Sequence, residues 1–121
     1  MAVRLHNPGY NRAKRLVAEG KVVLDARDDR SEHQPSAADE NAFIEAYGYA
    51  EYGRWHLGVD DERADDTKGH YKFPYGDFEA VHRCAVLAAE SRAGQREYID
   101  VELAAAHLHG ALDALSGAST R

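Results

Sequence analysis

The segment from Lys68 to Gly94 constrains the fold more than any other part of the chain. It combines closely spaced aromatic residues, a Pro-Tyr-Gly turn, a helix start and a run of small residues. From Tyr71 to Phe78 aromatic residues alternate with other residue types, which is typical of a short extended segment with one buried face. Asp77 is then placed to cap a helix that Gly94 ends. We therefore expect this segment to be the central packing unit of the fold.

Two further long helices are predicted around this segment. Ser36, followed by Asp39 three residues later, has the spacing of a capping box and starts a helix that bends or ends near Arg54. The last helix is expected to start at Asp100, and its alanine-rich face would let it pack closely against the preceding helix as an antiparallel pair. The apolar seam of this last helix is Val101, Ala104, Leu108, Leu112 and Leu115.

The N-terminal residues 1–35 are predicted to form a separate region, and residues 36–121 the compact helical domain. Residues 1–35 would hold a short basic helix from Asn11 to Gly20, an extended arm at Lys21–Asp25 and an exposed charged linker at Arg27–Pro35. If the arm forms a strand, its obvious partner is His70–Phe73. The predicted fold class is therefore mainly α: a small bundle of three main helices plus a short N-terminal helix, with at most a minimal two-stranded ribbon.

Charge and cysteine content exclude several classes of protein. The chain has 121 residues, a formal net charge of −6 and one cysteine, so no intrachain disulfide is possible. An acidic chain is a poor general binder of nucleic acids or anionic membranes. It also lacks an apolar run of the roughly 20 residues that a membrane span needs. Together with the lack of a signal-peptide pattern, this predicts a cytoplasmic protein.

The basic N-terminal segment leaves one nucleic-acid alternative open. Residues 1–21 hold five basic residues and one acidic residue, whereas the rest of the chain is strongly acidic. A basic head could bind nucleic acid or an acidic partner, although a solvated helix is the preferred interpretation. The residues that would act in a nucleic-acid-associated regulator are Arg12, Lys14 and Arg15.

The histidines and the cysteine of this chain could bind a transition metal. His82 and Cys84 are two residues apart, and on the predicted helix this spacing points them about 200° apart, so they cannot share an ion. Cys84 is expected to be a buried structural thiol in the helix interior, away from the helix N-terminus that would lower its pKa. No cofactor is expected. A site that combines His70, His82 and a histidine of the last helix remains as a metal-dependent enzyme alternative.

The order of motifs from Ser36 to Leu115 resembles a known family. The Ser-Ala-Ala-Asp helix start is followed by YGRWHL, an acidic loop at Asp60–Asp66, HYKFPYGDF and an alanine-rich helix. This order looks like a small domain found beside tailed-phage prohead proteases and related capsid-region proteins. The resemblance implies a helical accessory or interaction domain. It carries over no catalytic residue, because the protease's Ser/His module is absent.

The predicted function is that of a non-enzymatic accessory or protein-interaction domain, related to phage assembly. Its partner would be another protein or a second copy of the chain, with no membrane and no general nucleic-acid role. The candidate partner-binding residues are Trp55, Tyr71, Lys72, Phe73, Tyr75 and Arg83.

Overall fold

The fold is mixed α/β, with four long helices and five strands in two small sheets. The computed structural model describes residues 3–119, with the side chains of residues 3–30 and 33–115. Helices account for 60% of the chain, so the prediction of a mainly helical protein is right in part. The prediction of at most a two-stranded ribbon is wrong.

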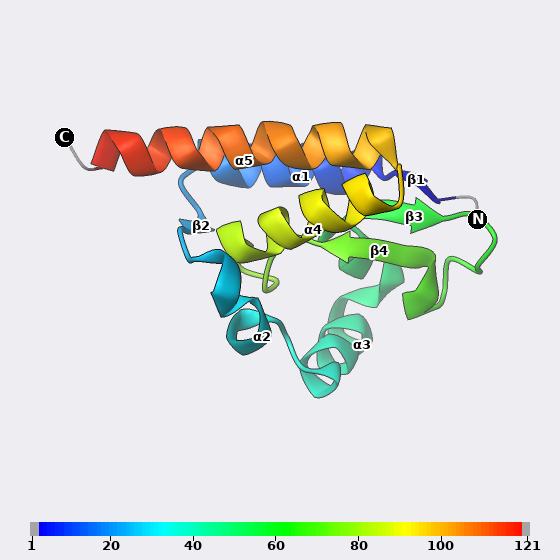
Figure 1. Cartoon of the computed structure of the whole chain (residues 1–121). Coiled ribbons are helices and arrows are strands. Elements are labelled where there is room, and N and C mark those ends of the chain that lie inside the picture. The colour runs from blue at the N-terminus through cyan, green and yellow to red at the C-terminus, as the bar shows by residue number, and fades with distance from the viewer. Residues whose placement is uncertain (1–2, 120–121) are drawn as a thin grey trace.

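The elements follow one another along the chain in the order shown in Figure 1. The helices are α1 (Asn7–Ala18), α2 (Arg30–His33), α3 (Ala37–Gly53), α4 (Arg83–Gln95) and α5 (Ile99–Ser119), with short 3₁₀ helices η1 (Arg27–Asp29) and η2 (Lys68–His70). The strands are β1 (Val3–Leu5), β2 (Val22–Val23), β3 (His56–Asp60), β4 (Tyr71–Pro74) and β5 (Val81–His82).

The larger sheet is antiparallel, in the order β1-β3-β4, and β3 is buried along its whole length. Gly58 in β3 lies opposite Lys72 of β4, and an added Cβ would lie 2.9 Å from the Phe73 ring. The second sheet pairs β2 with β5 in parallel, with Val22 opposite Val81. The N-terminal arm therefore pairs with residues 81–82, and the prediction that it would pair with residues 70–73 is wrong.

Helix α5 packs against α4 and α1 on one side of the molecule (Figure 1). Its predicted seam is confirmed, since Val101, Leu108 and Leu112 are fully buried. Helix α1 begins at Asn7, earlier than predicted, because Pro8 fits the first helical turn, where its missing N–H costs nothing. The residues that α1 adds to the same core are Ala13, Leu16 and Val17.

The capping box that starts α3 is confirmed. The Asp39 backbone N–H donates to Ser36 Oγ at 3.1 Å. The helix ends at Gly53, beside the predicted end near Arg54, and Gly48, with a φ of 87°, interrupts it earlier. The Tyr47 side chain of α3 is 65% exposed. Figure 1 shows why, because α3 lies apart from the α4–α5 layer. Instead Phe43 stacks on Phe78, with ring centroids 4.4 Å apart.

Helix α4 begins at Arg83, later than the predicted start at Asp77. Asp77 Oδ1 does accept backbone hydrogen bonds, from Glu79 at 3.0 Å and Ala80 at 2.8 Å, but these close a turn. Within that turn Phe78 has a φ of 71°, a left-handed conformation that no α-helix contains. The strand β5 comes next, and Cys84 therefore lies in the first turn of α4. The prediction that Cys84 lies in a helix interior is wrong.

Candidate metal centre

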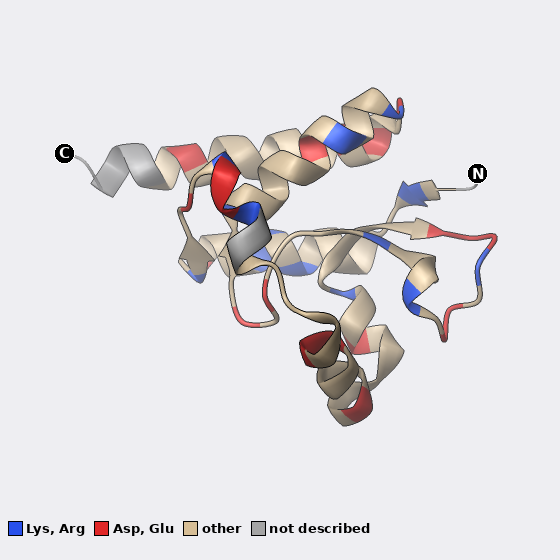
Figure 2. Ribbon diagram, turned by 60° about the horizontal axis from the view of Figure 1, so that its bottom comes forward, with Lys and Arg blue, Asp and Glu red and all other residues tan. Residues whose placement is uncertain are grey.

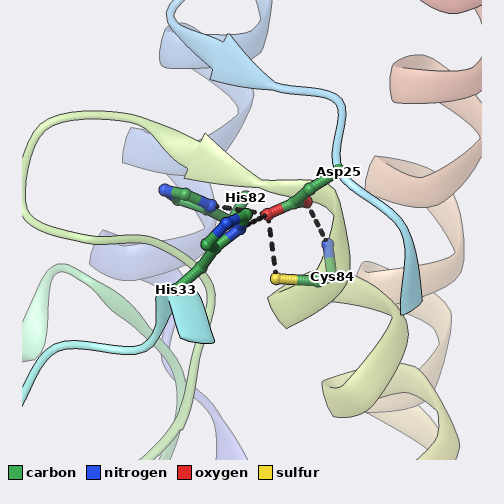
Figure 3. Close-up of side chains that lie close together, drawn as sticks. All are labelled: Asp25, His33, His82 and Cys84. Atoms are coloured by element: carbon green, nitrogen blue, oxygen red, sulfur yellow. Dashed lines mark hydrogen bonds and ion pairs between the residues drawn. The ribbon is translucent and has the colours of Figure 1, made fainter. Parts of the chain in front are cut away.

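Four metal-ligating side chains from three segments of the chain converge between β5, α2 and the start of α4 (Figure 3). Asp25 follows β2, His33 is the last residue of α2, His82 ends β5 and Cys84 lies in the first turn of α4. One ligand atom from each residue lies within 4.8 Å of the others.

The atoms of this cluster crowd around one carboxylate oxygen. Asp25 Oδ2 lies 2.6 Å from His33 Nδ1, 2.7 Å from His82 Nδ1 and 3.1 Å from Cys84 Sγ. The other oxygen, Oδ1, accepts the Cys84 backbone N–H at 2.7 Å. A carboxylate oxygen has two lone pairs, so three side-chain partners exceed its usual capacity. The four side chains therefore lie close enough together to act as ligands of one cation.

The cluster is buried on most sides and open at His33. The side chains of Asp25 and His82 are 3% and 8% exposed, whereas that of His33 is 36% exposed. Burial alone would raise the pKa of Asp25, but hydrogen bonds from His33, His82 and Cys84 lower it well below its usual range. Asp25 is therefore ionised at neutral pH, and His33 is the member of the cluster that solvent reaches most.

Cys84 is a protonated thiol when no cation is present. Burial is the main cause, and the hydrogen bond to the Asp25 carboxylate the second, of a rise in the pKa of Cys84 to about 12. The helix N-terminus favours a thiolate, but the adjacent carboxylate outweighs that effect. The thiol is therefore a poor nucleophile in this state. Coordination to a metal ion would deprotonate the thiol, because the positive charge of the ion favours the thiolate over the neutral thiol.

Asp77 holds His82 from the side opposite the cluster. Its Oδ2 lies 2.8 Å from His82 Nε2, so that Nδ1 faces Asp25. Burial lowers the pKa of His82, but the hydrogen bonds with Asp25 and Asp77 outweigh it and raise the pKa overall. A histidine that binds metal through one nitrogen usually donates its other N–H to a carboxylate or carbonyl. Asp77 therefore occupies the position of an outer-shell partner.

The prediction that His82 and Cys84 point about 200° apart on one helix is wrong. It assumed that both residues lie on one helix, but His82 has extended backbone angles, with φ −102° and ψ 126°. In extended backbone, side chains two residues apart point to the same face, and here the helix starts directly afterwards. The exposed linker predicted at Arg27–Pro35 instead contains α2, which brings His33 into the cluster.

The sequence alone identifies two of the four residues of this cluster, His82 and Cys84. The His-Arg-Cys motif at residues 82–84 becomes a ligand pair once a strand is assigned there. Nothing in the spacing identifies Asp25 or His33, because their approach depends on the parallel pairing of β2 with β5. His70 is outside the cluster: its Nδ1 lies 2.8 Å from the carbonyl oxygens of Asp60 and Arg63.

The candidate partner-binding residues divide into buried and accessible groups. Trp55 is 5% exposed and Tyr75 is fully buried, so both belong to the core and offer little surface to a partner. Arg83 donates to Asp113 of α5 at 2.9 Å and to the Asp25 carbonyl at 3.4 Å, next to the cluster. The partly buried strand β4 carries the remaining three, Tyr71, Lys72 and Phe73. A role of these residues in partner binding stays a prediction.

The three basic residues of the nucleic-acid alternative lie on α1. Arg12 donates to Glu51 at 2.9 Å, and Arg15 lies 3.9 Å from Glu19. The Lys14 ammonium lies 4.4 Å from the centre of the Tyr10 ring. Two of the three charges are therefore paired with carboxylates, and a nucleic-acid role stays a prediction.

No protein-family model, curated protein or solved structure matches this chain. The resemblance to the phage-associated domain therefore stays a prediction. No helix among residues 3–119 is both long and apolar enough to cross a membrane.

Proposed function

We propose that this chain is a zinc-binding domain that holds one ion through Asp25 Oδ2, His33 Nδ1, His82 Nδ1 and Cys84 Sγ. The observation that carries the proposal is the convergence of these four atoms within 4.8 Å of one another. Thiolate, imidazole and carboxylate are the ligands zinc takes in proteins, and four-coordinate sites are the rule for structural zinc.

Distances within the cluster fit a tetrahedral ion after small side-chain movements. Zinc bonds of about 2.0–2.1 Å to nitrogen or oxygen and about 2.3 Å to sulfur place ligand atoms roughly 3.3–3.6 Å apart. Contacts of Asp25 Oδ2 with the other three atoms are 2.6–3.1 Å. Each would lengthen by about 0.5–0.8 Å as hydrogen bonds are replaced by metal bonds.

The charges of the ligands also suit a divalent ion. The Asp25 carboxylate and a Cys84 thiolate together carry two negative charges, and the two imidazoles bind in their neutral form. Their sum cancels the charge of Zn²⁺, which matters in a buried site where an uncompensated charge is costly. The Asp77 carboxylate would keep His82 in the required tautomer.

A four-ligand set supports a structural role over a catalytic one. Catalytic zinc sites keep three protein ligands and an open position for water or substrate. Here the ion would tie the four-residue helix α2 to β5 and α4. We therefore retain the non-enzymatic accessory or interaction domain as the preferred class, with a metal added to it. The association with phage assembly remains part of this proposal, and capsid or portal genes beside this one would support it.

Zinc titration of protein purified without a histidine tag tests the proposal. We expect one zinc ion per chain, and a cobalt-substituted protein with the absorption of tetrahedral cobalt and a thiolate-to-cobalt charge-transfer band. Cys84→Ser should abolish that band, and His33→Gln should weaken zinc binding more than the ~10–100-fold that an outer-shell change costs.

The matched control is His107→Gln, because the His107 ring lies against Tyr10 at 6.2 Å and outside the cluster. This variant should bind zinc as tightly as the parent chain. A folded parent chain that fails to bind zinc or cobalt would refute the proposal and leave the cluster as a hydrogen-bond network. Equal loss of affinity in His107→Gln would refute the assignment of the ligands.

A further inference from the structure

A hollow of about 280 Å³ lies between α2, β4 and α4. None of the four side chains of the metal cluster lines it. Three cationic side chains line it: Arg30 from α2, Lys72 from β4 and Arg92 from α4. Among the residues whose side chains the structure describes, no acid is part of its wall. The remaining wall is formed by Gln34, Phe73, Pro74, Ala85, Ala88 and Ala89.

Among the residues that the structure describes, these three cations differ from most others because none of them contacts a carboxylate. Elsewhere Arg4, Arg12 and Lys68 each contact a carboxylate within 3.3 Å. Within the described part of the chain, by contrast, the side chains around this hollow make no ion pair or hydrogen bond to an acid. Acidic residues outnumber basic ones in this chain, so three neighbouring cations without a carboxylate partner are unexpected. Figure 2 shows acidic residues at η1, along α3 and in the loop after β3.

The arrangement is unfavourable without an anion. Arg30 is partly buried, and burial lowers the pKa of its guanidinium, although the charges of Asp25 and Glu40 partly oppose this shift. Arg30 therefore loses hydration, and the charge of Arg92, whose own side chain is exposed, adds a smaller repulsion. A bound anion would offset both costs, and guanidinium groups present paired donors that match phosphate oxygens.

From this geometry we infer that the Arg30–Lys72–Arg92 hollow binds a small phosphate monoester. A phosphate dianion compensates two of the three charges, whereas a carboxylate compensates one. The alanine side chains of α4 and the Phe73 ring provide an apolar wall for a compact organic group. The volume lies at the lower end of the usual range of roughly 300–1,000 Å³ for ligand sites, so the ligand must be small.

Binding of three probes by isothermal titration calorimetry tests the inference: inorganic phosphate, phenyl phosphate and benzoate. Phenyl phosphate should bind more tightly than inorganic phosphate, because its ring adds the apolar contact, and benzoate should bind most weakly. Arg92→Gln and Lys72→Met should each weaken phenyl phosphate binding about tenfold or more, as loss of a charged hydrogen-bond donor does.

The matched control is Arg15→Gln, which removes the same charge from an exposed position on α1. It should change phenyl phosphate affinity by less than about twofold, because exposed charges act weakly at long range. An equal loss in Arg15→Gln would overturn the site, since binding would then follow net charge. Absence of phenyl phosphate binding to the folded chain, or benzoate binding as tightly, would also overturn it.

Zinc affinity separates this inference from the proposed function, because Lys72 and Arg92 are not ligands of the cluster. Both variants should bind zinc like the parent chain. If the parent chain binds phenyl phosphate but no zinc, the proposed function fails and the phosphate site stands. If zinc binds and phenyl phosphate does not, only the phosphate site fails.

Discussion

His56 makes the stability of this protein depend on pH between about pH 6.5 and pH 3. Its side chain is 3% exposed, and its Nδ1 lies 2.9 Å from the Tyr52 carbonyl oxygen, to which the neutral ring donates. Burial, only partly opposed by that hydrogen bond, lowers the pKa of His56 to about 3. The folded protein therefore keeps this imidazole neutral under conditions in which the unfolded chain protonates it.

The sign and size of the effect follow from linkage. Because the folded pKa of about 3 is below the unfolded value of about 6.5, the unfolded chain binds the extra proton as the pH falls. The free energy of unfolding contributed by His56 is complete above pH 6.5 and decreases as the solution is acidified. Between pH 7 and pH 4.5 the loss is about 2.5 kcal/mol. At pH 4.5 this figure is set almost entirely by the unfolded-state pKa.

Urea unfolding at pH 7.0, 5.5 and 4.5, with chelator present, measures this loss. The comparison is His56→Asn, whose amide nitrogen can take the place of Nδ1 as donor to the Tyr52 carbonyl. The difference in unfolding free energy between parent and variant should shift by about 2.5 kcal/mol across the range, because other titrating groups are common to both. A difference that stays constant with pH would show that His56 is not held neutral and would refute the reasoning.

Two further predictions concern the outer shell of the metal cluster and the packing of α1. Asp77→Asn removes the charge behind His82 without removing a ligand, so zinc affinity in a chelator competition should fall by about 10–100-fold; an unchanged affinity would contradict the role given to Asp77. Gly9→Ala places a Cβ against the His56 carbonyl and should lower the free energy of unfolding by about 1–3 kcal/mol. At Gly110 an added Cβ would meet nothing within 4 Å, so Gly110→Ala should raise the free energy of unfolding by up to about 1 kcal/mol. Equal effects of the two glycine substitutions in urea unfolding would contradict the close approach at Gly9.

The parts of the fold that sequence patterns predict are those governed by local chemistry. Ser36 and Asp39 form their capping box within four residues, and α3 ends at Gly53, beside the predicted end near Arg54. The seam of α5 follows from helical periodicity over many residues, with Leu108 and Leu112 fully buried. Each of these features is determined by neighbours in the sequence, so no tertiary information is needed.

The parts that were missed depend on contacts between distant residues. Strand β3 is buried on both faces, so the alternation that identifies a half-buried strand is absent from it. Asp77 has the chemistry of a helix cap and closes a turn instead, which moves the start of α4 and brings Cys84 beside His82. Asp25 reaches the same place through pairing of β2 with β5, a contact across nearly sixty residues that no local pattern encodes.

The proposed zinc site is tested most directly by X-ray absorption at the zinc edge of the zinc-loaded chain. The account predicts a four-coordinate ion with one sulfur at about 2.3 Å, from Cys84, and three nitrogen or oxygen ligands at about 2.0–2.1 Å. In Cys84→Ser the sulfur contribution should disappear. A parent spectrum without sulfur, or with six oxygen and nitrogen ligands, would contradict coordination by Asp25, His33, His82 and Cys84.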